Sequence, residues 1–230
     1  MSTTYVIQPP EIPTLPVQGD SKRFAVNRIY CVGRNYADHA REMGHDPDRE
    51  PPFFFMKPAT AIVTDGKNMA YPSLSNDVHH EIEMVVALGK GGANIPADQA
   101  LDHVWGYGVG LDMTRRDLQG EAKKMGRPWD TGKAFDQSAP CSALVPVSQC
   151  GHLAKGRIHL KVNGQINQDG DLAMMIWNVA DTIAYLSTLF TLMPGDLIFS
   201  GTPAGVAAVA RGDVLEGHVD GLPVLKTTMV

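Results

Sequence analysis

The sequence predicts an α+β protein built around a large mixed β-structure. The chain contains many short apolar runs of strand length, most of them bounded by glycine, proline, asparagine or aspartate. It contains few segments with helical periodicity. Strands and helices do not alternate strictly along the chain, which argues against both a Rossmann sheet and a TIM barrel.

Composition restricts the range of functions. The 230 residues are 43% hydrophobic, enough for one sizeable core or two small ones. The net charge is −5 and no basic stripe is present, so we expect no nucleic-acid partner. No apolar run reaches the roughly 20 residues of a membrane span, and no signal-peptide pattern opens the chain. The three cysteines lack CxxC spacing, which favours reduced thiols and a cytoplasmic protein.

The N-terminal segment differs from the rest. Four prolines and the turn signal Gly19-Asp20 lie close together near the start of the chain. Proline removes a backbone donor and disfavours regular structure. We therefore predict an extended arm over residues 1–24 and a single domain over residues 25–230.

The first half of that domain reads as strands around one short helix. We predict strands at Ile29–Val32 and Ala61–Val63, and a buried strand at Phe53–Met56 ending beside Lys57. Between them, Ala37–Met43 is predicted as a short helix that ends at Gly44.

That short helix carries a candidate base. His39 and Glu42 are three residues apart and share a helix face. A carboxylate beside an imidazole orients the ring and raises its basicity, as a general base requires. On spacing alone, an ordinary surface helix with a solvated His and Glu is the alternative.

A candidate metal site follows. Glu81 and Glu83 alternate at the start of the apolar run Met84–Leu88, so both carboxylates project from one strand face. Asp112 follows a second apolar run, Val104–Leu111. Buried carboxylates repel one another, and a divalent cation removes that cost. Oxygen ligands favour Mg²⁺, with Mn²⁺ or Ca²⁺ as alternatives. A bare Glu-x-Glu on a solvated strand face is the competing interpretation.

Polar residues downstream are candidate anion contacts. Thr114 is predicted to cap a helix over Arg115–Lys124, on which Arg116 and Gln119 share a face. Both side chains could bond the oxygens of a metal-bound anion. Gly126, Pro128 and Gly132 break this helix and place Lys133 in a loop.

The C-terminal half reads as a hairpin, a long helix and closing strands. Asn163-Gly164 predicts a hairpin between Ile158–Val162 and Gln165–Gln168. Met174–Phe190 is predicted as a helix with an apolar stripe, and Leu197–Phe199 as a strand. The small residues of Ser200–Gly205 let backbone approach a ligand closely.

Four stretches together resemble the fumarylacetoacetate hydrolase family: YCVGRNYADHAREMG, FFFMKPATAIV, HHEIEMVVALG and GYGVGLDMTRRDLQ. Their order and spacing extend the resemblance over residues 25–225. The chain is most similar to the small, single-domain, acylpyruvase-like members. Within that group its motifs most resemble those of bacterial fumarylpyruvate hydrolases. The family's site segment TGTP begins here with Ser200.

The resemblance implies a fold, a reaction and a set of roles. It implies a mixed β-sandwich roll, a homodimer, and residues 25–230 as the catalytic domain. It implies hydrolysis of a carbon–carbon bond in an acylpyruvate, such as fumarylpyruvate in gentisate breakdown. By this resemblance Arg116, Gln119 and Lys133 match the family's substrate-binding Arg, Gln and Lys. For the reaction we expect His39, Glu42 and Lys133 as catalytic residues, and substrate contacts from Arg116, Gln119 and Thr202, with Lys57 and Arg34 as weaker candidates.

Two other functions stay open. The same metal chemistry serves oxaloacetate decarboxylation, hydration and isomerisation within the family. A non-enzymatic metal-binding protein is the third reading, although a purely structural metal site needs no base such as His39.

Overall fold

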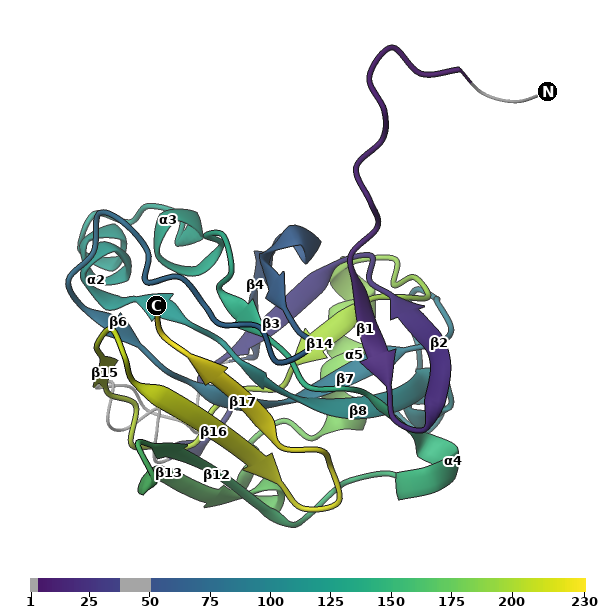
Figure 1. Cartoon of the computed structure of the whole chain (residues 1–230). Helices are drawn as coiled ribbons and strands as arrows, with labels where there is room; N and C mark the ends of the chain where they lie inside the picture. Colours follow the sequence, from purple (N-terminus) through teal and green to yellow (C-terminus); the bar gives the residue numbers. More distant parts are fainter. Residues whose placement is uncertain (1–3, 38–50) are drawn as a thin grey trace.

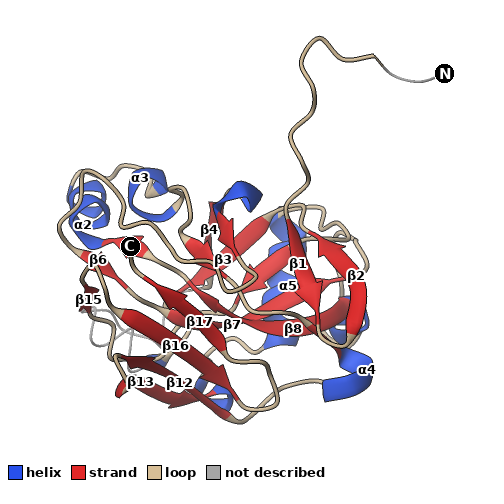
Figure 2. Ribbon diagram, in the orientation of Figure 1, coloured by secondary structure: helices blue, strands red, loops and turns tan. Residues whose placement is uncertain are grey.

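A six-stranded mixed sheet organises the computed structural model, which describes residues 4–37 and 51–230 (Figures 1 and 2). In spatial order its strands are β11 (Val145–Pro146), β8 (Val104–Leu111), β7 (Ile82–Leu88), β14 (Leu197–Phe199), β3 (Ile29–Gly33) and β4 (Phe53–Lys57). Only β14 and β3 run parallel, and every other neighbouring pair is antiparallel. The predicted α+β class with a mixed sheet is confirmed.

The strand directions bring several chain ends to one edge of this sheet. Because β7 is antiparallel to both of its neighbours, its N-terminal end lies beside the C-terminal ends of β8 and β14. Strand β3 is parallel to β14, so its C-terminal end lies at the same edge. All seven residues of β7 are buried, as expected for a central strand. This edge therefore collects the segments that follow β3, β8 and β14.

A second sheet covers one face of the first and closes the main core. It contains β13 (Gln165–Asp171), β12 (Arg157–Val162), β16 (Val214–Val219) and β17 (Leu225–Thr228), all antiparallel. The predicted hairpin is confirmed, since Asn163 and Gly164 both have positive φ, at 51° and 83°. Ile158 and Leu160 of β12 share one buried cluster with Met84 of β7 and Val109 of β8.

Helix α5 (Val179–Leu189) packs Ile183 and Leu186 into the same buried cluster. It begins later than the predicted Met174, because Leu172–Met174 form a short 3₁₀ turn and the Asn178 side chain caps α5 by accepting from the Asp181 amide. Other short elements of the described residues are η1 (Ala59–Ala61), β5 (Ile62–Val63), η2 (Ala100–His103), β10 (Ala139–Pro140) and α4 (Val147–Cys150).

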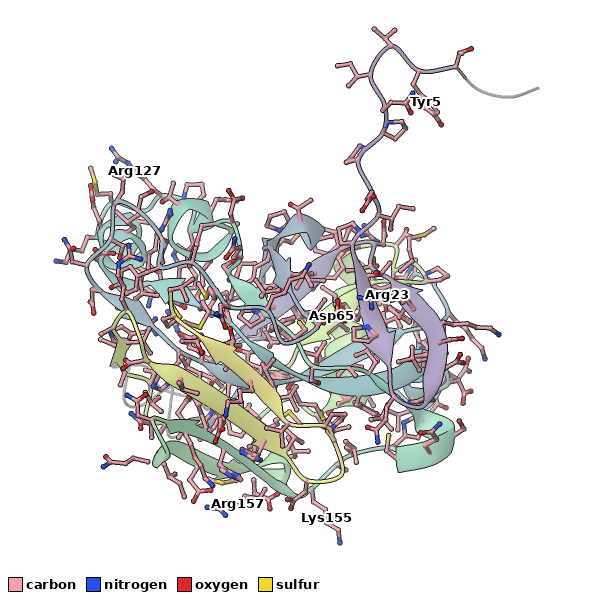
Figure 3. The ribbon with its side chains drawn as sticks, in the orientation of Figure 1. Tyr5, Arg23, Asp65, Arg127, Lys155 and Arg157 are labelled. Atoms are coloured by element: carbon pink, nitrogen blue, oxygen red, sulfur yellow. The ribbon has the colours of Figure 1, made fainter. Side chains whose placement is uncertain are left out.

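The N-terminal segment is only partly the predicted arm. Residues 4–13 leave the body of the molecule, and Tyr5 lies far out on this stretch (Figure 3). However, β1 (Thr14–Val17) and β2 (Asp20–Ala25) form a hairpin. Leu15 is fully buried, and Arg23 pairs with Asp65 at 2.9 Å. The prediction of an extended arm is therefore wrong for residues 14–24, where buried side chains outweigh the proline signal.

Three local predictions near the sheet edge also need correction. Thr114 caps no helix: it lies in β9 (Thr114–Arg115), its hydroxyl donates to the Asp112 carbonyl, and α2 (Arg116–Lys124) begins without a side-chain cap. Lys133 ends a short helix, α3 (Asp130–Lys133), and does not lie in a loop. The β4 phenylalanines are only half-buried, whereas Lys57 is fully buried. Strand β9 pairs with β6 (Val78–His79), which also pairs with β15 (Ala208–Val209).

Candidate active site

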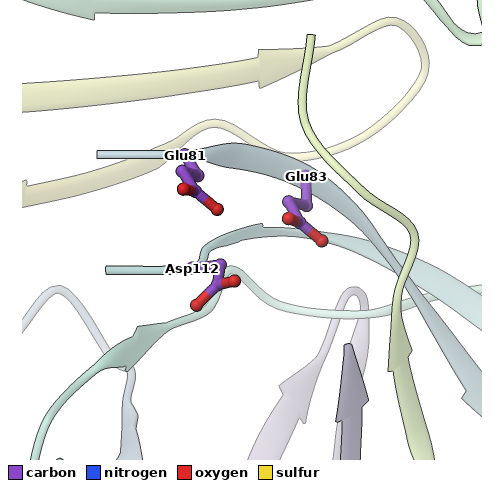
Figure 4. A group of neighbouring side chains, drawn as sticks. All are labelled: Glu81, Glu83 and Asp112. Carbon is purple, nitrogen blue, oxygen red and sulfur yellow. The ribbon is translucent and has the colours of Figure 1, made fainter. Parts of the chain in front are cut away.

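Three carboxylates lie together at the shared sheet edge (Figure 4). Glu81 immediately precedes β7, Glu83 is the second residue of β7, and Asp112 follows β8. The Asp112 amide donates to the Glu81 carbonyl at 2.8 Å, which continues the β7–β8 ladder and fixes the spacing of the side chains. Each residue offers a carboxylate oxygen, these oxygens lie within 4.8 Å of one another, and all three residues are buried. The predicted acid cluster therefore forms.

The side chains of Lys57, Arg116 and Lys133 neutralise two of these acids, Glu81 and Asp112. The Lys133 ammonium lies 2.7 Å from Glu81 Oε2 and 2.6 Å from Asp112 Oδ2, and Arg116 Nη2 lies 2.5 Å from Glu81 Oε1. Burial lowers the pKa of Lys133, but the charges of Asp112 and Glu81 outweigh burial and raise it overall. Lys133 is therefore a permanent cation and hydrogen-bond donor in this site.

Glu83 has no such partner. Its Oε2 accepts from the Gly201 amide at 2.8 Å, and within residues 4–37 and 51–230 no cationic side chain lies within 4.0 Å of it. Burial, Asp112 and Glu81 raise the pKa of Glu83 well above its usual value. A buried carboxylate in this state needs a cation or a proton. Together with the all-oxygen donor set, it fits a hard divalent ion such as Mg²⁺ or Mn²⁺.

A pocket opens above the carboxylates and encloses about 390 Å³, including open space at its mouth. It combines the three acids with cationic, amide, hydroxyl and aromatic side chains. Besides the acids, its polar and aromatic lining is Arg34, Phe53, Phe55, Arg116, Gln119, Lys123, Trp129, Lys133 and Thr202. An anionic, oxygen-rich molecule of small size suits these walls.

Helix α2 turns one face towards this pocket. Arg116 Nη1 donates to Gln119 Oε1 at 2.7 Å, and because a guanidinium can only donate, the Gln119 NH₂ group is left to bond a ligand. Lys123 lies four residues after Gln119 on the same face, with its ammonium 5.0 Å from the Trp129 ring centre. Burial, Arg116 and Arg34 lower the pKa of Lys123 to about 8. Lys123 was not predicted from the sequence, although its spacing of four residues from Gln119 was a usable signal.

Lys57 does not belong to the pocket wall. Its ammonium lies 2.8 Å from Asp112 Oδ1, donates to the Met113 carbonyl at 3.1 Å and also donates to the Lys133 carbonyl. Lys57 is fully buried among these three partners and is not one of the residues that line the pocket. The prediction that Lys57 contacts substrate does not fit this geometry. Lys57 instead forms an ion pair with Asp112.

Arg34 and Thr202 do reach the pocket. Arg34 follows β3 with a left-handed backbone (φ 57°), and its guanidinium lies 5.1 Å from the Phe53 ring centre. Thr202 is buried in the segment after β14, and its hydroxyl oxygen accepts from Gln168 at 2.8 Å. Gln168 has no local sequence signal, because its partners lie far away in the chain.

The predicted general base His39 and its partner Glu42 lie outside the described residues. The same holds for the helix predicted over Ala37–Met43, of which only Ala37 is described. Two other histidines lie close to the acids. His79 Nε2 is 2.8 Å from Asp77, and His80 Nδ1 is 2.8 Å from Gln168 Oε1. Burial lowers the pKa of both rings. Because they adjoin the acid pair in the sequence, His79 and His80 are the alternative bases if His39→Ala keeps near-parental activity.

Buried carboxylates able to hold a metal ion lie beside a cationic wall on a mixed β-fold, an arrangement that suits metal-dependent chemistry on a small anion. Comparison with known families is more specific. The model described as "Fumarylacetoacetate (FAA) hydrolase C-terminal" matches residues 28–230. The chain belongs to the fumarylacetoacetate hydrolase family.

Individual relatives agree on the family and differ in activity. The crystal structure of fumarylpyruvate hydrolase from Pseudomonas aeruginosa, in complex with Mn²⁺ and pyruvate, is 53% identical, with a TM-score of 0.97 over 99% of both chains. The fumarylpyruvate hydrolase of Ralstonia sp is 45% identical over 81% of this chain and 98% of its own. The mitochondrial oxaloacetate tautomerase FAHD1 of Rattus norvegicus is 44% identical over 84% of this chain and 87% of its own.

Within the described residues, no helix has both the length and the apolar character needed to cross a bilayer.

Proposed function

We propose that this protein is a metal-dependent hydrolase that cleaves a carbon–carbon bond in an acylpyruvate, with fumarylpyruvate as the leading candidate and fumarate and pyruvate as its products. The observation that carries this proposal is the buried Glu83, which no cation of the described residues neutralises. It lies beside Glu81 and Asp112 in a pocket walled by Arg116, Gln119 and Lys133. The relative crystallised with Mn²⁺ and pyruvate supports the same ligand pair.

The residues divide the work by their chemistry. Glu81, Glu83 and Asp112 would hold Mg²⁺ or Mn²⁺, which when bound polarises the oxygens of a 2-oxo acid. Arg116 and Lys133 carry the positive charge that retains an anionic substrate. The Gln119 amide presents its hydrogens to a carboxylate or carbonyl oxygen.

His39, oriented by Glu42, is proposed to take a proton from water. Water oxygen then bonds to the distal keto carbon, and the carbon–carbon bond to the pyruvate half breaks. The electron pair leaves with the pyruvate half as its enolate, which then gains a proton. Lys133 is charged and donates hydrogen bonds in this site, so it stabilises negative oxygen and does not act as a base.

Oxaloacetate tautomerisation is the second candidate, favoured by the relative FAHD1. It needs proton transfer but no attacking water. Oxaloacetate decarboxylation, the alternative predicted from the sequence, shares the 2-oxo acid end of the substrate. A homodimer, a cytoplasmic location and a place in gentisate breakdown stay predictions.

A substrate panel separates these activities. Fumarylpyruvate, acetylpyruvate and oxaloacetate are each supplied with Mn²⁺, while enol absorbance and released pyruvate are followed together. Hydrolysis consumes the enol of an acylpyruvate and releases one pyruvate for each molecule consumed. Tautomerisation changes enol absorbance without pyruvate, and decarboxylation releases pyruvate from oxaloacetate only. Absence of pyruvate from every acylpyruvate would overturn the proposal.

A further inference from the structure

Gln168 on β13 links the second sheet to the active-site edge. Its side chain is fully buried and has four hydrogen-bond contacts of 2.8 to 3.0 Å. Oε1 accepts from the Ile82 amide and contacts His80 Nδ1, while Nε2 contacts the Thr202 hydroxyl and the Pro203 carbonyl. One amide thus joins the start of the metal-site strand to the loop after β14.

The orientation of this amide is fixed by its partners. The Ile82 amide can only donate, so the Gln168 atom facing it must be oxygen. The Pro203 carbonyl can only accept, so the atom facing it must be nitrogen. Both ends require the same arrangement, and a flipped amide would lose both bonds. His80 must therefore carry its hydrogen on Nδ1.

The same logic fixes the Thr202 hydroxyl. Because Gln168 Nε2 donates to Thr202 Oγ1, the hydroxyl hydrogen cannot point back at Gln168. Thr202 is buried and lines the pocket, so its hydrogen is available to an acceptor there. A carboxylate or keto oxygen of a 2-oxo acid is such an acceptor.

We propose that Gln168 is a positioning residue that makes Thr202 a hydrogen-bond donor to an oxygen of the bound 2-oxo acid. This inference takes its substrate class, a 2-oxo acid, from the proposed function. Gln168 itself touches no substrate and acts through Thr202. Pyruvate, the part common to all acylpyruvates, is the simplest ligand that should sense it.

The discriminating variant is Gln168→Glu. A carboxylate still accepts from Ile82 and His80, so the metal-site strand keeps its anchor. It cannot donate to Thr202, whose hydroxyl then donates to Glu and is lost to the ligand. Calorimetric binding of pyruvate to the Mn²⁺-loaded protein should weaken about 10- to 100-fold, the range for one hydrogen bond to a charged group. Gln165→Glu, an exposed change on the same strand, should leave binding unchanged.

A double-mutant cycle with Thr202→Val separates positioning from general damage. Each single variant should weaken pyruvate binding by a similar factor, and the double variant should be no weaker than Thr202→Val. Multiplied losses in the double variant would overturn the proposal, because Gln168 would then act independently of Thr202. Thr202→Ser keeps the hydroxyl and should therefore bind pyruvate as the parent protein does.

Neutron diffraction from the deuterated parent protein with Mn²⁺ and pyruvate tests the geometry without any variant. The Thr202 deuteron should point away from Gln168 and towards a pyruvate oxygen. A deuteron on the line from Thr202 to Gln168 would overturn the proposal. Both readouts use pyruvate binding, so they stand even if the substrate panel assigns tautomerisation and not hydrolysis.

Discussion

Replacing Lys57 with methionine tests how the metal-site acids are supported. The methionine fills a similar volume without the ammonium group. Asp112 keeps Lys133 at 2.6 Å but loses Lys57 at 2.8 Å, and the Met113 carbonyl loses a donor at 3.1 Å. These groups are buried, so water cannot replace the lost partner freely.

The expected loss is large for one substitution. Removing one partner of a buried ion pair costs about 3–5 kcal/mol of unfolding free energy. For a chain of this size each kcal/mol shifts the midpoint by about 2–4 °C, so Lys57→Met should unfold about 6–20 °C lower. Calorimetry or far-ultraviolet circular dichroism gives the midpoint, and the exposed Lys90→Met is the matched control. A loss equal to that of the control would refute the buried network.

Three further predictions follow from other sites. His39→Ala should lower kcat by about 10²- to 10⁴-fold while Mn²⁺ affinity stays unchanged, and unchanged turnover in a steady-state assay would remove it as the base. His159 and His218 stack with parallel rings 4.5 Å apart, and burial lowers the pKa of both. The unfolded chain therefore binds more protons than the folded chain below about pH 6.5, and the free energy of unfolding falls as pH falls. His218→Gln should make the melting temperature fall less between about pH 7.5 and pH 5.5, as thermal melts can measure. Gly201→Ala should reduce both stability and metal affinity, because Gly201 has φ 95° and an added Cβ would lie 2.6 Å from the Asn35 Cβ; parental values in melts and Mn²⁺ titrations would contradict this.

Local patterns predicted much of the central sheet. The runs that became β3, β7, β8 and β14 are apolar and end at glycine, an acid or serine, so their strands were legible. Asn163-Gly164 predicted its hairpin for a conformational reason that the positive φ values bear out. The acid cluster was predicted because Glu81 and Glu83 adjoin one buried run and Asp112 ends the next.

Contacts between residues far apart in the chain could not be predicted from the sequence. Lys57 follows a run of phenylalanines and looked like an end-of-strand lysine, yet its partners come from segments about 56 and 76 residues away. Gln168 reads as an ordinary hairpin residue until Ile82 and Thr202 are placed beside it. The N-terminal hairpin was hidden by Pro16 and the prolines just before it, since the burial of Leu15 depends on the folded core.

Reconstitution with metal tests the central claim most directly. The parent protein, Glu83→Gln and the exposed control Glu121→Gln are stripped with a chelator and titrated with Mn²⁺ while fumarylpyruvate hydrolysis is followed. The parent and Glu121→Gln should lose turnover on stripping and regain it with Mn²⁺. Glu83→Gln should stay inactive at the Mn²⁺ concentration that restores the parent, because it has lost the charge that the ion neutralises. Turnover that survives complete stripping, or equal restoration of Glu83→Gln, would contradict a metal centre at these three carboxylates.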